Sequence, residues 1–204
     1  MKEHIRQLCD SHPRLMFMDK TSLLINNVRI LGTTLWSYVP PNGKDICEMY
    51  LNDYRIIFTE NPNDPSKPNT LTAAKSNEWF EDELRWLESE IAGSMQRGEP
   101  SVMVLTHHTP SFYKTSAPQY DTHPWKSHAA VDSGPERRWT HCCFSSDLER
   151  MFAPTTNVKV WAFGHTHFNN DQIVGGTRLV SNQKGYSKTG DEGFLRNFVV
   201  QVDA

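Results

Sequence analysis

Residues 102–108 read VMVLTHH, and residues 158–167 read VKVWAFGHTH. Each stretch begins as an apolar run rich in β-branched residues, which is typical of a strand covered on both faces of a sheet. Each run then ends on histidine, at His107-His108 and at His165-Thr166-His167. Because sites in α/β sheets gather beyond the carboxyl ends of strands, these two stretches predict an α/β domain with a polar site where the strands end.

The longest predicted helix spans about 72–92, because its apolar residues recur at spacings of three and four. Those residues are Phe80, Leu84, Leu87 and Ile91. Thr70 or Thr72 can cap the start of this helix, and Gly93 or Gly98 can end it.

Two hairpins are predicted, over 23–31 around Asn26-Asn27 and over 173–180 around Gly175-Gly176, because asparagine and glycine suit tight turns. Further predicted elements are a helix over 1–9, strands over 15–18 and 198–202, and a short helix ending at Phe152 and capped by Ser145 or Ser146. Together these elements predict a layered α/β fold with a mixed sheet, in which residues 1–204 form a single domain.

Composition narrows the function classes. The 204 residues carry a formal net charge of −3, with a pI of about 6.3, which argues against a strongly basic nucleic-acid binder. No apolar run approaches the roughly 20 residues that a membrane helix needs. The first residues, MKEHIR, lack the apolar core of a secretory signal. We therefore expect a cytoplasmic protein with no nucleic-acid or membrane partner.

Four cysteines are present, Cys9, Cys47, Cys142 and Cys143, and none forms a C-x-x-C pair. Adjacent cysteines are awkward ligands for one metal. At this density a disulfide framework is not expected, so the sequence predicts reduced thiols, in keeping with the cytoplasm.

The strand-end histidines indicate metal binding. In an extended chain, positions i and i+2 point to the same side, so His165 and His167 are expected to aim at one volume, and Gly164 lets the backbone approach closely. If the two strands are neighbours, His107 joins them. Neutral imidazole is a common ligand of zinc, iron and manganese. The alternative is a structural role, since a single strand-end histidine is more often only hydrogen-bonded.

Two motifs carry a resemblance to a known family. The sequences GHTH (164–167) and LTHHTP (105–110) resemble the C-terminal motifs of calcineurin-like metallophosphoesterases. Residues 28–37, VRILGTTLWS, and 181–186, SNQKGY, are also similar to members of that superfamily. The likeness runs from about Val28 to the end of the chain.

The resemblance implies a four-layer α-β-β-α sandwich with mixed sheets and a two-metal phosphoesterase site. By that likeness His107 binds one metal, while His165 and His167 bind one metal each. The implied cofactors are divalent ions of manganese, iron or zinc, and the implied substrate is a phosphoester, attacked at phosphorus by a metal-bound hydroxide.

The family's earlier motifs, an Asp-x-His, a Gly-Asp and a Gly-Asn-His, are not found where they are expected. Asp10-Ser11-His12 has the first spelling, but it ends a helix-like segment before Pro13, so we interpret it as coincidence. Neutral histidines cannot offset the repulsion of two cations. The sequence thus predicts an incomplete binuclear site, holding one metal weakly, in the C-terminal part of a phosphoesterase domain.

Several roles stay open at this point. His108 can act as a catalytic acid, or it can support the neighbouring ligands, and the second role is favoured. Asp171 is a candidate for orienting an imidazole, and Asn182 is a candidate either for reaching the site or for packing its own turn. Residues of the long segment 109–143 are candidates for contacting phosphate or for simple solvation: Tyr113, Lys114, His123, Lys126, His128, Arg137 and Arg138.

The enzyme hypothesis has one rival. A chain that lacks the acidic motifs can be a non-catalytic remnant, or a partner-binding module of the same fold. Metal identity, the particular phosphoester and the oligomeric state are not indicated by the sequence.

Overall fold

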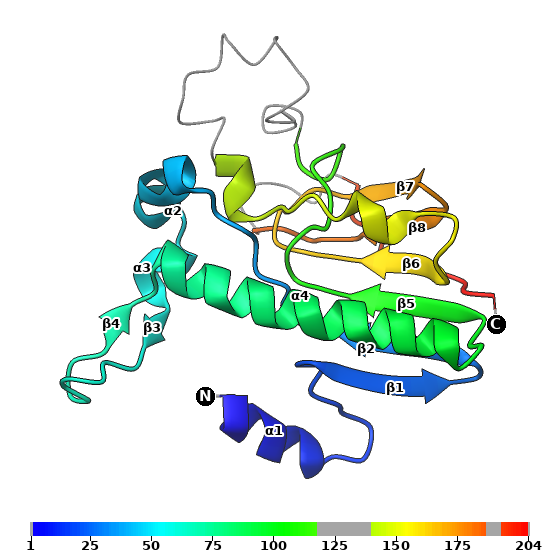
Figure 1. Ribbon diagram of the computed structural model, residues 1–204, viewed down its shortest axis with the longest axis horizontal. Helices are drawn as coiled ribbons and strands as arrows, with labels where there is room; N and C mark the ends of the chain where they lie inside the picture. Colours follow the sequence, from blue (N-terminus) through cyan, green and yellow to red (C-terminus); the bar gives the residue numbers. More distant parts are fainter. Residues whose placement is uncertain (1, 118–139, 187–192, 204) are drawn as a thin grey trace, which may run out of the picture.

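Four parallel strands form the middle of the molecule (Figure 1). The computed structural model describes residues 2–117, 140–186 and 193–203. Its main sheet has the order β1-β2-β5-β6-β8-β7, with β1 and β7 antiparallel to their neighbours at the two edges. The strands are β1 (Thr21–Ile25), β2 (Val28–Gly32), β5 (Ser101–Leu105), β6 (Val158–Ala162), β7 (Asn170–Val174) and β8 (Thr177–Ser181). The predicted α/β architecture with a mixed sheet is confirmed.

Helix α4 (Ala73–Gln96) crosses one face of this sheet (Figure 1). Its start is capped as predicted, because the Thr72 hydroxyl accepts a hydrogen bond from the Lys75 backbone N–H at 3.2 Å. Gly98, in the left-handed region at φ 69°, follows its end. The helix runs one turn beyond the predicted range.

Smaller elements surround the sheet. They are α1 (Lys2–Asp10), α2 (Lys44–Tyr50), α3 (Asp53–Ile56), a two-stranded sheet of β3 (Phe58–Thr59) and β4 (Asn69–Thr70), and the 3-10 helices Pro41–Gly43, His141–Cys143 and Glu149–Phe152. In Figure 1, strands β5 and β6 point toward the side of the molecule where α2 and α3 lie. No helix in the described ranges is long and apolar enough to cross a bilayer.

Both predicted hairpins are confirmed. Asn26 and Asn27 adopt φ values of 46° and 65°, the left-handed pair that a two-residue turn between twisted strands requires. Gly175 has φ 61°, and a Cβ there would lie 2.5 Å from the Phe152 carbonyl oxygen, so only glycine fits this turn.

The core lies between α4 and the sheet. Leu31, Trp161 and Leu179 from the strands and Leu87 from α4 are completely buried. The Phe152 ring packs edge-on against Trp161 at 5.4 Å. These aromatic and aliphatic side chains fix the strand positions, and through them the ends of the strands.

Two predicted strands are wrong. Residues 15–18 form no strand: Leu15 and Met16 are exposed, and Met18 packs where Gly32 leaves room for it. Residues 198–202 also form no strand, and Val199 is 80% exposed. Short apolar runs do not fix a strand when no neighbouring edge pairs with them.

The helix that ends at Phe152 is present, but only as the 3-10 turn Glu149–Phe152, without a side-chain cap. Ser145 and Ser146 bond elsewhere. Ser145 contacts the Thr109 hydroxyl at 3.2 Å, and the Ser146 hydroxyl accepts a hydrogen bond from the Tyr38 backbone N–H at 3.1 Å. Both serines therefore join distant loops instead of starting a helix.

The prediction of four reduced thiols is also wrong. Cys47 of α2 and Cys143 form a disulfide across 96 positions of sequence, while Cys9 and Cys142 are unbonded. A pairing over such a distance leaves no spacing signal in the sequence. Its effect is to tie α2 to the segment just before Phe144.

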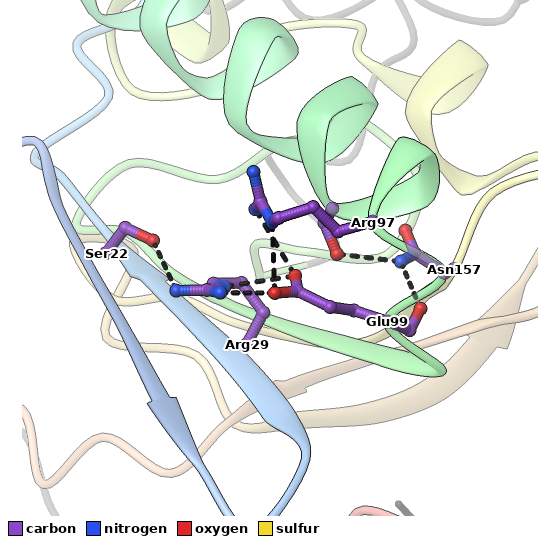
Figure 2. A network of polar contacts seen from close by, with 6 residues as sticks. Ser22, Arg29, Arg97, Glu99 and Asn157 are labelled. Carbon is purple, nitrogen blue, oxygen red and sulfur yellow. Dashed lines mark hydrogen bonds and ion pairs between the residues drawn. The ribbon is translucent and has the colours of Figure 1, made fainter.

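At the amino ends of the strands, charged side chains form a closed network (Figure 2). The Glu99 carboxylate accepts hydrogen bonds from Arg29 Nε at 3.0 Å and from Arg97 Nε at 3.1 Å. These two guanidinium groups hold the pKa of Glu99 well below its usual range. Asn157 Nδ2 donates to the Glu99 carbonyl oxygen at 2.8 Å, which links this network to the start of β6.

Candidate functional site

Three imidazole rings meet at the carboxyl ends of β5 and β6. The two strands are neighbours in register, with Leu105 opposite Ala162, so the residues that follow them are brought side by side. The ring centroids of His107 and His165 lie 5.0 Å apart, those of His108 and His165 4.5 Å, and those of His107 and His108 5.5 Å. We refer to His107, His108 and His165 as the histidine cluster.

Backbone hydrogen bonds fix the cluster to the sheet. The Thr34 carbonyl oxygen, just beyond β2, accepts hydrogen bonds from the backbone N–H groups of His107 and His108, at 3.0 and 3.2 Å. The Gly164 N–H donates to the His107 carbonyl oxygen at 3.0 Å. A Cβ on Gly164 would lie 3.3 Å from His107 Nδ1, so glycine allows the close approach that the sequence predicted.

The backbone of the Gly-His-Thr-His segment is not extended, which corrects the basis of one prediction. His165 and His167 both adopt left-handed conformations, with φ 66° and 51°, and the Thr166 N–H bonds back to the Gly164 carbonyl oxygen at 2.8 Å. The rule that i and i+2 share a side therefore does not apply here.

His167 lies outside the cluster. Its side chain is exposed, and its ring packs edge-on against Tyr186 at 4.4 Å. Its backbone N–H donates to Gln183 Oε1 at 2.9 Å. Of the three predicted metal ligands, the structure brings His107 and His165 into ring contact and places His167 to one side.

His108 is buried, with 1% of its surface exposed. Its Nδ1 lies 2.9 Å from the Ser37 hydroxyl, and its ring packs 5.1 Å from Trp36. Its Nε2 is buried without a hydrogen-bond partner in the described structure. Burial lowers the pKa of His108 well below its ordinary value, so this ring is neutral.

Asp53, the first residue of α3, also lies beside the cluster and was not predicted from the sequence. Its Oδ2 lies 3.5 Å from His165 Nε2. The neighbouring His165 imidazole lowers the pKa of Asp53, so the carboxylate is ionised at neutral pH. Desolvation, followed by charge on His165, lowers the pKa of His107. No motif marks Asp53, because the fold alone brings it to the strand ends.

Other candidate residues lie elsewhere. Asp171 forms a two-point ion pair with Arg178 at 2.8 Å, so the role suggested for it in orienting an imidazole is wrong. Asn182 Nδ2 donates to the Leu195 carbonyl oxygen at 2.8 Å and holds a turn. Asp10 and His12 are exposed at the end of α1.

The candidates in the segment 109–143 are only partly described. Tyr113 is 48% exposed, and the Lys114 ammonium lies 5.0 Å from its ring. The carbonyl oxygens of these two residues accept hydrogen bonds from Gln172 and Asn170 of β7. The other five candidates lie outside the described residues: His123, Lys126, His128, Arg137 and Arg138.

These residues fit a metal ion in part. His107 and His165 supply imidazole nitrogen and Asp53 supplies a carboxylate, the donor types that zinc, iron and manganese take. Within residues 2–117, 140–186 and 193–203, however, no three such side chains are arranged together to hold a metal. The cluster therefore offers donor atoms of suitable types but not a complete set of ligands.

Comparisons with known proteins add little about chemistry. No family model matches the chain, and no solved structure matches it. The chain is 22% identical over 183 residues to uncharacterized protein L509 of Acanthamoeba polyphaga mimivirus. This match covers 90% of the chain but 59% of the viral protein, so the chain spans well under two thirds of that relative's length.

Proposed function

We propose that the chain carries the histidine-rich part of a metal-dependent phosphoester hydrolase. The observation that supports this most directly is the gathering of His107, His108 and His165 at the carboxyl ends of two parallel strands. Sites of α/β sheets form at such ends. The four-layer sandwich of the metallophosphoesterases belongs to this proposal, as the larger fold in which the mixed sheet would be one layer.

In this proposal each residue has a separate task. His107 and His165 supply metal ligands, and His167 supplies a ligand only after its ring leaves Tyr186. A divalent metal, when bound, supplies Lewis-acid activation of water and offsets the phosphoryl charge. His108 is buried and neutral at neutral pH, so we assign it the supporting role, with Ser37 fixing its ring.

The test is hydrolysis of p-nitrophenyl phosphate and bis-p-nitrophenyl phosphate in the presence of Mn²⁺. We expect slow, Mn²⁺-dependent turnover that falls to background in His107→Ala and His165→Ala, because each change removes an imidazole donor. Asp171→Asn serves as a control, since it alters only an exposed ion pair. Turnover that survives both histidine changes would contradict the ligand assignment.

A non-catalytic module of the same fold is the second candidate. It is favoured by the absence of a complete three-ligand arrangement among the described residues and by apolar side chains exposed on edge strand β1, Leu24 at 51% and Ile25 at 48%. Absence of turnover with Mn²⁺, Fe²⁺ and Zn²⁺ alike would favour this module over the hydrolase.

The cytoplasmic location predicted from the sequence is part of the proposal. The expectation of reduced thiols no longer supports it, because two of the four cysteines form a disulfide. Disulfides are rare in the reducing cytosol, and the Cys47–Cys143 bond is more typical of an oxidising compartment. Thiol titration of protein isolated from its native cell under alkylating conditions tests the point, because a cytosolic chain is expected to show four reactive thiols after denaturation.

A further inference from the structure

We propose that Asp53 and His165 are two ligands of one divalent cation, with Asp53 supplying the carboxylate that the recognised motifs lack. This inference rests on the proposed function, since it names the acidic residue of the same site. It starts from one contact, the 3.5 Å between Asp53 Oδ2 and His165 Nε2.

That distance suits shared coordination better than a direct hydrogen bond. Charge-assisted bonds between an imidazole and a carboxylate are shorter, about 2.7–2.9 Å. Two ligand atoms that are each about 2.1 Å from a tetrahedral metal lie about 3.4 Å from one another. The two side chains thus have the spacing of neighbouring ligands, although their elements are far apart in sequence.

Rigid neighbours hold Asp53 in place. The next residue, Tyr54, is 4% exposed, and its hydroxyl lies 2.9 Å from Ser76 Oγ of α4. Before it, Leu51 is buried and Cys47 is bonded to Cys143. The carboxylate is therefore anchored on both sides, as a preorganised ligand should be.

His165 is anchored in the same way. Its ring stacks on Phe144 at 5.7 Å with an interplanar angle of 20°, and Phe144 follows Cys143 directly. One disulfide therefore ties the segment that carries Asp53 to the segment whose Phe144 packs on His165. The His107 ring, whose centroid lies 5.0 Å from that of His165, is the candidate for a third donor in this proposal.

A second observation, independent of this pair, points to an absent ligand. His108 is buried against His165, and its Nε2 has no hydrogen-bond partner in the described structure. A buried polar atom without a partner is costly. A cation with ordered waters beside His165 would give that nitrogen a water to bond.

The experiment is titration of the whole chain with Co²⁺ alone, followed by visible absorption and by calorimetry. We expect one Co²⁺ per chain, with affinity reduced at least tenfold in Asp53→Asn and in His165→Gln. Asp45→Asn is the matched control, because Asp45 is an exposed carboxylate on the neighbouring helix α2. Equal affinity in Asp53→Asn and the parent chain, or no Co²⁺ binding by the parent chain, overturns the inference.

A measurement on the unaltered chain covers the case in which a variant does not fold. Mn²⁺ is paramagnetic, so it should broaden the carboxyl ¹³C signal of Asp53 and the imidazole signals of His165 before those of other aspartates and histidines. Broadening that begins elsewhere overturns the inference. Because neither readout needs turnover, a chain that binds Co²⁺ through Asp53 but hydrolyses nothing refutes the proposed function and leaves this inference standing.

Discussion

The two ends of the central sheet are built from charged groups in opposite ways. At the amino ends, Glu99 lies between the guanidinium groups of Arg29 and Arg97, so opposite charges meet (Figure 2). At the carboxyl ends, imidazoles lie against one another with one carboxylate beside them. The first arrangement stabilises the fold without any further group. The second has no such internal pairing of opposite charges, which is the arrangement expected if the proposed cation binds there.

The largest effect is expected from the bond that holds the carboxyl end together. The double variant Cys47→Ala/Cys143→Ala opens a loop of 96 positions, and chain entropy predicts a loss of about 4.7 kcal/mol in the free energy of unfolding. Urea denaturation measures it. Cys9→Ala, which removes a cysteine outside the disulfide, should leave the midpoint unchanged. A double variant as stable as the parent would show that the disulfide contributes no stability.

Glu83 provides the next test, because its situation is the reverse of that of Glu99. Burial raises the pKa of Glu83 from 4.5 to about 7, although its carboxylate accepts a hydrogen bond from the Trp36 N–H at 3.0 Å. Stability from the protonated form is present in acid and is lost as the pH rises from about 4.5 to 7. The free energy of unfolding of Glu83→Gln, taken relative to that of the parent, should therefore rise by up to about 3 kcal/mol between pH 4 and pH 8.

Urea denaturation of the parent and of Glu83→Gln at pH 4 and at pH 8 measures this change in relative stability. A constant difference between variant and parent across this range would mean that Glu83 does not titrate there. The Trp36 ring contacts His108, so the same curves report on the side of the core that supports the histidine cluster.

A smaller effect is expected at the amino end. Glu99→Gln should cost about 1–3 kcal/mol at neutral pH, because it weakens charge-assisted bonds to Arg29 and Arg97. Since the folded pKa of Glu99 lies below 4.5, this contribution is complete above that pH and is lost as the pH falls through the lower, folded value.

Asp171→Asn removes the exposed ion pair with Arg178 and serves as the reference for Glu99→Gln. Its expected cost in the free energy of unfolding is below about 1 kcal/mol. Co²⁺ affinity should be the same in the parent and in Glu99→Gln, because the two ends of the sheet act separately. A Glu99 variant with altered Co²⁺ affinity would break the comparison.

The smallest expected change comes from Gly164→Ala. The added methyl group would lie 3.3 Å from His107 Nδ1, so the ring must shift by a few tenths of an ångström. We expect about 1 kcal/mol, or roughly fivefold, weaker Co²⁺ binding with little change in stability. Gly93→Ala in α4 is the matched control, since its methyl group meets only the flexible end of Arg97. Unchanged affinity would mean that His107 does not take part in binding.

Local patterns predicted much of the fold. The Asn26-Asn27 turn, the helix over Phe80 and Ile91 and the Gly98 that follows it are each specified by neighbouring residues, so sequence alone finds them. The meeting of His107 with His165 was also predictable, because parallel neighbouring strands end at the same edge of the sheet.

The features of the site that the sequence did not predict depend on long-range packing. Asp53 reaches His165 only because Tyr54 and the Cys47–Cys143 bond seat α3 beside the strand ends, and none of these contacts has a sequence spacing. The extended geometry assumed for His165 and His167 was wrong, because both residues adopt left-handed backbone conformations. Such strained residues concentrate at functional sites, which is where pattern rules fail most often.

The contact between Ser37 and His108 has one more consequence. A serine hydroxyl can either donate to Nδ1 or accept from it, and a rotation of its hydrogen switches between the two. Both tautomers of the buried ring are thus equally compatible with the same heavy-atom positions. His108 Nε2 can therefore donate a hydrogen bond in one tautomer and accept one in the other. The change between the two tautomers moves only hydrogen atoms.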